Sequence, residues 1–164
     1  MTRLLTLSAI LLTWAACTND SNDMVPLDLF AQGGLPITIM APDSARVTQG
    51  IDLPGTKEVI ITAGDDYGVQ VTQSPRSSGT VASLVEDAKA TVRGGEFFKE
   101  IVQEYEDGFV FSTSINDNPE DDSYDFRRIR LKGDYVYEFG TQFGEQYSQA
   151  QAEQMYESVA AAAE

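Results

Sequence analysis

The sequence of 164 residues contains no histidine, one cysteine (Cys17) and one tryptophan (Trp14). Without histidine the chain lacks the commonest metal ligand and the usual general base near neutral pH. A single cysteine forms no internal disulfide and supplies no cluster of thiolates for a metal. The composition therefore excludes most transition-metal sites and the catalytic triads that depend on histidine.

Basic residues are scarce as well. Eleven lysines and arginines stand against 26 aspartates and glutamates, which gives a formal net charge of −15 at pH 7. An acidic surface of this kind repels phosphate backbones and anionic lipid headgroups. We therefore expect no nucleic acid among the partners and no attachment to a membrane through a basic patch. No motif indicates a cofactor, and we expect none.

The sequence has no apolar run long enough to cross a membrane as a helix, which takes about 20 residues. Residues 4–14 are weakly polar to apolar, follow the positive charge of Arg3, and precede Ala15 and Ala16. This order of a charge, a short apolar stretch and small residues is typical of a cleaved export signal. We predict that residues 1–16 form a signal peptide.

The tetrapeptide Trp14-Ala15-Ala16-Cys17 resembles a bacterial lipobox, in which two small residues precede a cysteine that is acylated and becomes the new amino terminus. Trp14 stands where leucine is usual. The resemblance implies that Cys17 is a lipid attachment site and that its acyl chains hold the protein on a membrane. The alternative is an ordinary secreted protein with a spare thiol.

The residues after Cys17 are polar and acidic, so we interpret 17–34 as a lipidated, flexible tether. Asp20 and Asp23 lie where Bacteroidota lipoproteins carry a surface-export signal, and the resemblance implies the cell envelope and the outer membrane, with the face left open. A plain spacer is the other interpretation. Residues 35–164 match the length of one ordinary domain.

The first half of this domain is predicted to contain strands and a helix. We expect a strand over 37–40 and a hairpin of strands over 59–61 and 67–71, which turns at 64–66. The continuous apolar run 59–61 suits a strand that is covered on both faces. From Val81 the apolar period becomes helical through Val92; Thr80 can cap this helix, and Gly94-Gly95 end it.

The second half reads as four strands in a meander, over 100–105, 109–115, 124–131 and 135–141, followed by a helix. Asp-Gly at 107–108 favours a tight turn. In the third of these strands the apolar phase slips, which indicates either a bulge near Arg127-Arg128 or burial on both faces. The helix opens with the capping box Ser148 to Gln151. Its apolar face contains Ala152, Met155, Tyr156 and Val159.

Together these elements predict an α+β fold, with an antiparallel sheet of about six to seven strands flanked by two main helices. Their order and lengths over residues 35–162 resemble the PsbP-like fold, which the extrinsic photosystem II subunit shares with small nuclear-import accessory proteins and DcrB-like bacterial lipoproteins. The resemblance implies an assembly or binding accessory. It carries over no functional residue, because these proteins have no common catalytic centre.

Four of the few basic residues lie close together, at Arg127, Arg128, Arg130 and Lys132. One interpretation is that they neutralise cross-strand carboxylates such as Glu138. The other is a positive stripe that docks an acidic envelope protein or an anionic ligand.

Oxygen-rich side chains also gather at Asp117, Glu120, Asp121 and Asp122, and carboxylates of this kind suit Ca²⁺. Pro119 interrupts the run and no glycine relieves it, so a solvated loop is favoured over a metal site.

The sequence best fits a membrane-anchored lipoprotein that acts as a non-enzymatic binding or assembly accessory of the cell envelope. The alternative is a carboxylate-based hydrolase of envelope polymers, for which the acidic pairs 65–66, 86–87 and 104–107 are candidates. Such chemistry needs two carboxylates within about 10 Å of each other in a cleft.

Overall fold

The computed structural model describes residues 23–115 and 121–160. Within these ranges the helices are α1 (Leu29–Gly33), α2 (Val81–Arg93) and α3 (Gln149–Ala160). The strands are β1 (Met24–Asp28), β2 (Thr38–Pro42), β3 (Arg46–Leu53), β4 (Thr56–Ala63), β5 (Tyr67–Pro75), β6 (Phe98–Tyr105), β7 (Gly108–Thr113), β8 (Ser123–Lys132) and β9 (Tyr135–Thr141).

Seven strands form one antiparallel sheet in the order β3-β4-β5-β9-β8-β7-β6, and β1 pairs with β2 in a second, two-stranded sheet. The predicted α+β class, the size of the main sheet and the four-strand meander β6 to β9 are confirmed. The hairpin of β4 and β5 is confirmed as well. Pairing of β5 with β9 joins the two halves of the chain at the centre of the sheet.

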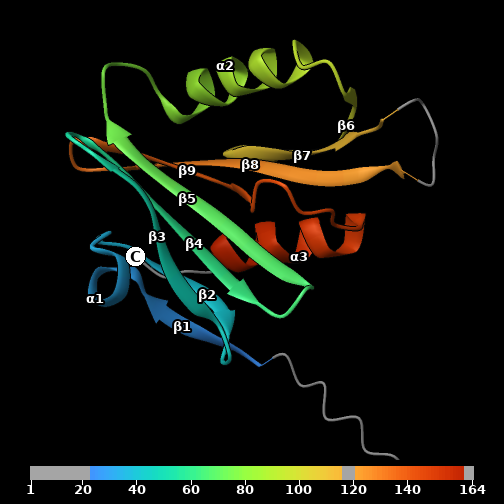
Figure 1. Cartoon of the computed structure of the whole chain (residues 1–164). Coiled ribbons are helices and arrows are strands. Elements are labelled where there is room, and N and C mark those ends of the chain that lie inside the picture. Colours follow the sequence, from blue (N-terminus) through green and yellow to red (C-terminus); the bar gives the residue numbers. More distant parts are fainter. Residues whose placement is uncertain (1–22, 116–120, 161–164) are drawn as a thin grey trace, which may run out of the picture.

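The main sheet separates two layers (Figure 1). Helix α2 lies on one face and packs against β6, β7 and β8. Helix α3 lies on the opposite face, where β2 packs beside it. The larger apolar core fills this second side and contains Val59, Val69, Phe126, Met155 and Val159. A smaller cluster of Val85, Phe109, Phe111 and Ile129 lies under α2.

Both helices begin as their sequences predict. Thr80 accepts a hydrogen bond from the backbone N–H of Ser83, and the Ser83 hydroxyl accepts one from the backbone N–H of Thr80, which completes a capping box at α2. At α3 the Ser148 hydroxyl accepts from the Gln151 N–H while the Gln151 side chain accepts from the Ser148 N–H. Local side-chain chemistry therefore fixes where each helix starts.

The predicted tether, residues 17–34, extends too far along the chain, because the folded domain begins earlier. Residues 24–33 form β1 and α1 instead of a solvated segment, and Leu29 is fully buried. β1 pairs with β2, and its Met24 and Leu27 pack against the larger apolar core, whereas Val25 is exposed. The folded part therefore includes Met24, and the strands and helix of 24–33 belong to the domain.

The phase slip in β8 reflects burial on both faces. Phe126 is fully buried in the larger core, whereas Ile129 is buried under α2. No register shift interrupts the pairing of β8 with β7 or β9. The alternative of a bulge at Arg127-Arg128 is therefore wrong, because the two apolar phases serve two different cores.

The outer strands differ from the expectation in two ways. β3 was not predicted, since its sequence is mostly exposed and lacks an apolar stripe. The run 59–61 was predicted to be covered on both faces, but Ile60 is only partly buried because α2 packs over the other end of the sheet. Register shifts lie in the β3–β4 and β6–β7 ladders, so each edge strand takes part in an irregular pairing.

Candidate functional site

The four basic residues of the predicted stripe do not form one surface. Consecutive residues of a strand point to opposite faces. Arg128, Arg130 and Lys132 point to the α3 side, where each donates a hydrogen bond to a backbone carbonyl. Arg127 points to the α2 side. A single docking stripe therefore does not exist on the folded protein.

Arg128 and Arg130 bind the carboxyl-terminal half of α3. Arg130 donates to the Val159 carbonyl at 2.7 Å and lies over the ring of Phe139. Arg128 pairs with Asp107 at 2.5 Å and lies over the ring of Tyr156. Cations at this end of a helix satisfy free carbonyls and complement the helix dipole. These two residues hold α3 on the sheet.

Asp107 also joins the turn between β6 and β7 to α3. Its second carboxylate oxygen accepts a hydrogen bond from the Tyr156 hydroxyl at 2.5 Å. Burial, followed by this bond to the carboxylate, raises the pKa of Tyr156 above its usual range. Asp107 is thus committed to the interior contacts of α3 and is unavailable as a general base.

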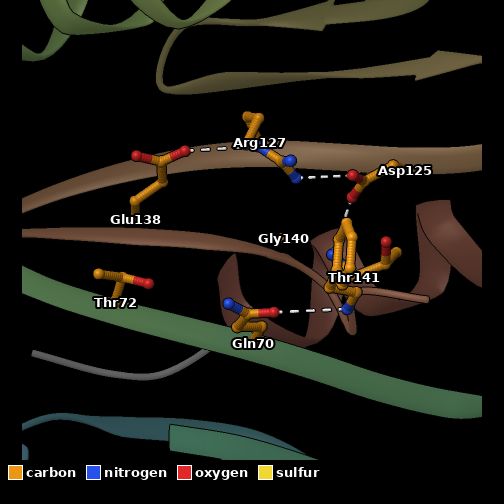
Figure 2. A pocket seen from close by; sticks show the side chains of 8 residues that line it. Gln70, Thr72, Asp125, Arg127, Glu138, Gly140 and Thr141 are labelled. Carbon is orange, nitrogen blue, oxygen red and sulfur yellow. Dashed lines mark hydrogen bonds and ion pairs between the residues drawn. The ribbon is translucent and has the colours of Figure 1, made fainter. Parts of the chain in front are cut away.

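Arg127 lies in a hollow on the other face, between two carboxylates (Figure 2). Its guanidinium donates to Asp125 at 2.7 Å and contacts Glu138 at 3.4 Å. It also donates to the Phe126 carbonyl and lies over the ring of Phe111. The expectation that these cations neutralise cross-strand carboxylates such as Glu138 is confirmed for Arg127.

Asp125 ties this ion pair to the end of β9. One of its oxygens accepts hydrogen bonds from the backbone N–H groups of Phe126 and Thr141, at 2.6 and 2.8 Å. The ladder between β8 and β9 ends at Arg128 and Phe139, so the carboxylate satisfies an N–H just beyond the ladder. Both Asp125 oxygens are therefore occupied by protein donors.

Two glycines let polar side chains lie flat on this face. A Cβ on Gly140 would overlap the Arg127 guanidinium, and a Cβ on Gly50 would overlap the Glu58 carboxylate. Glu58 accepts a hydrogen bond from the Gln70 amide at 2.6 Å, and Gln70 in turn accepts from the Phe143 N–H at 3.4 Å. The polar side chains of neighbouring strands are thus linked across the sheet.

The hollow around Arg127 continues into a second one beside α2. The first, of about 190 Å³, is lined by β5, β8 and β9 together with Phe143, which is 91% exposed. The second, of about 450 Å³, lies between α2 and the sheet and includes Leu84, Asp87, Ile129 and Val136. Arg127 and Glu138 line both hollows. We call the two together the groove.

We call the uncovered part of the sheet beside this groove the open face. It consists of the outward side chains of β4, β5 and β9, represented by Glu58, Ile60, Gln70, Thr72 and Glu138. All five are at least partly exposed. On the opposite face, α1, α3 and the β1–β2 sheet pack against the same strands (Figure 1).

The remaining predicted sites are dispersed. Asp117 and Glu120 lie outside the described residues, and Asp122 pairs with Lys99 at 2.5 Å, which lowers the pKa of Asp122. The described part of the chain holds no group of three or more potential metal ligands. Cys17 also lies outside the described residues.

The proposed acidic pairs do not form a cleft either. Asp66 accepts a hydrogen bond from Gln151, whereas Glu86 and Glu104 share the buried ammonium of Lys89. These bonds raise the pKa of Lys89, and the bond to Glu86 makes the largest contribution. Glu138 shares one hollow with Asp125 and another with Asp87, and the sequence predicts neither pairing.

Sequence reasoning missed most of the groove. Gln70 and Thr72 are the polar positions of the alternating strand β5, and such positions ordinarily face solvent. The signal available was the aspartate two residues before Arg127, at the same face of the strand. The sequence offered Glu138 as a cross-strand partner of the basic residues. Nothing in it placed Asp125 beside this pair or Arg127 next to α2, since that proximity comes from strand order.

No family model matches the chain, and neither curated proteins nor solved structures give a match. The resemblance to PsbP-like and DcrB-like proteins therefore stays a prediction. Among the described residues, no helix has the length and apolar character to cross a membrane.

Proposed function

We propose that this protein is a lipoprotein of the cell envelope, anchored to a membrane through acyl chains on Cys17, which serves as a non-enzymatic binding or assembly accessory. Its contact with a partner is the open face with the groove. The observation that carries the proposal is the asymmetry of the sheet. One face is covered by α3 and the β1–β2 sheet, whereas α2, over β6, β7 and β8, is the only described element on the other.

The early start of the fold supports a close anchorage. Six residues lie between Cys17 and Met24, the first residue of β1. Fully extended, this segment spans at most about 25 Å. An acylated Cys17 would therefore keep the domain close to the membrane surface. Such a protein can meet partners of the same membrane more readily than freely diffusing ones.

The edges of the sheet favour contact through the face. Bulges twist an edge strand and interrupt the row of N–H and C=O groups that another strand would need. Both the β3–β4 and the β6–β7 ladders contain register shifts, whereas the inner ladders contain none. Addition of a partner strand at either edge is thereby disfavoured.

The same geometry gives less support to a carboxylate hydrolase. Asp125 and Glu138 lie on one guanidinium in a hollow, which meets the requirement for proximity. A general base, however, needs a free oxygen to accept a proton from water. Both oxygens of Asp125 already accept hydrogen bonds from the protein.

Two measurements test the proposal. The first is the intact mass of the protein extracted from membranes, which should show an acylated amino terminus at Cys17 and no residues 1–16. A Cys17→Ala variant should be recovered in the soluble fraction. A freely soluble wild-type protein with an unmodified thiol would refute the anchorage.

The second is site-specific photo-crosslinking in whole cells, with benzoylphenylalanine placed on either side of the sheet. Phe143 on the groove and Phe30 on α1 are both exposed, 91% and 65% respectively, and form a matched pair. We expect a discrete crosslinked species from position 143 and none from position 30. Crosslinks from position 30 alone, or from neither, would contradict the open face as the contact.

A further inference from the structure

The groove has a consistent chemical character, in spite of the arginine at its centre. Among the residues that line it, Asp87, Asp125 and Glu138 are acidic and Arg127 is basic, which leaves a net charge of −2. The charge of Arg127 is already balanced by two carboxylates. Arg46 of β3 lies beside the open face, opposite Thr62 and several residues along β4 from Glu58.

The larger hollow combines this charge with an apolar floor. Leu84, Ile129 and Val136 provide the apolar surface. Asp87 on α2 and Glu138 on β9 line the same hollow. A side chain that suits it has an aliphatic stem and a positively charged end. Lysine and arginine have this form, since they bury their methylene groups and leave the charge at a polar rim.

The length of the groove favours an extended chain. It is lined by β9 from Val136 to Thr141. A strand rises about 3.3 Å per residue, so this length corresponds to roughly 17 Å, or about five residues of an extended peptide. Gln70, Thr72 and Ser74 of β5 line the same groove and offer amide and hydroxyl groups to a polar backbone.

We infer that the groove takes an extended, basic peptide segment of a partner protein, with one lysine or arginine side chain between Asp87 and Glu138. This inference rests on the proposed function. It adds to the proposed contact face the chemical class of the ligand. The charge is opposite to that of the acidic partner considered for the basic stripe, because the folded protein uses the cations of that stripe internally.

The test is direct binding of three fluorescein-labelled, acetylated octapeptides to the full chain in non-ionic detergent, followed by fluorescence anisotropy. The peptides alternate threonine with lysine, glutamate or glutamine. We expect only the lysine peptide to bind, and its affinity to fall as sodium chloride screens the charges. Asp87→Asn and Glu138→Gln should each weaken binding about threefold.

Glu157→Gln is the matched control, because Glu157 is an exposed carboxylate of α3 on the opposite side of the sheet. It changes the net charge by the same amount and should leave the affinity unaltered. Equal losses of affinity in all three variants would show that only the net charge of the protein matters, and would overturn the inference. Preference for the glutamate peptide, or no preference, would overturn it as well.

Spermidine separates a peptide from a small polyamine. If spermidine displaces the lysine peptide at equal or lower concentration, the occupant is a polyamine and the inference of a peptide fails. Crosslinking at position 143 without any preference among the peptides would refute the ligand chemistry and keep the proposed function. Binding of the lysine peptide without crosslinking in cells would refute the proposed function and keep the chemistry of the groove.

Discussion

Gly140 of β9 lies directly beneath the guanidinium of Arg127 on β8, and a Cβ at this position would overlap Nη1. Arg127 cannot easily move aside, since it bonds Asp125, Glu138 and the Phe126 carbonyl. Backbone and side chain therefore fit each other at the centre of the groove.

Gly140→Ala should lower the free energy of unfolding by about 1 to 3 kcal/mol through overpacking. In an Arg127→Ala background the same substitution should cost much less, because the overlapping atom is gone. Denaturant unfolding of the four proteins in this double-mutant cycle gives the coupling. An equal cost in both backgrounds would show that the two residues do not interact.

Asp107→Asn should destabilise the protein by about 2 kcal/mol, because it leaves the largely buried Arg128 with a weaker partner and alters the bond to Tyr156. Glu106→Gln, at the exposed neighbouring position, should change the free energy of unfolding by less than about 0.5 kcal/mol. Thermal unfolding of the two variants compares them. Similar losses would contradict the anchoring role of Asp107.

Arg130→Met should lower stability by about 1 kcal/mol through loss of the bond to the Val159 carbonyl, and should leave binding of the lysine peptide unchanged. This separates the structural cations from the groove. A change in peptide affinity without a change in melting temperature would show that Arg130 does contribute to binding.

Alkaline pH should destabilise the fold. Burial raises the pKa of Tyr67 to about 12 and that of Tyr147 to about 12, from an ordinary value of 10.0. Above pH 10 the unfolded chain releases phenolic protons that the folded protein retains, so stability falls as pH rises from 10 to 12. Below pH 10 these groups contribute no pH dependence. Unfolding at fixed denaturant, monitored by circular dichroism across this range, checks the prediction.

Removal of residues 1–16 should leave a protein without tryptophan, since Trp14 is the only one. The mature protein should therefore show the emission spectrum of tyrosine alone. The unprocessed chain serves as the control, because it retains Trp14 and emits at longer wavelength. Tryptophan emission from the membrane-extracted protein would show that the predicted cleavage does not occur.

Particular elements show what the sequence predicted. The alternation in β5 and β9, the helical period of α2, the caps at Thr80 and Ser148 and the Asp-Gly turn at 107–108 are all local patterns. Each depends on residues within a few positions of one another, so each can be predicted without knowing which distant segments pack against it. The α+β class follows from their order.

The groove was not predictable in this way. Arg127 and Arg128 are adjacent in sequence, yet one faces Glu138 and the other faces α3. The pleat separates neighbours, and the residues that neutralise them come from distant segments. The sequence of β1 likewise predicts part of a tether, since the strand that pairs with it follows only after α1.

The sequence alone determined the local elements, the strong negative charge and the prediction of an anchored amino terminus at Cys17. Only the tertiary structure decided which face of the sheet stays open, which cations are consumed inside the fold and which carboxylates remain at the groove. The reason is that strand pairing between β5 and β9 and the docking of α2 on β8 bring together groups far apart in the chain. Electrostatic and packing interactions depend on distance in space, which a linear pattern does not contain.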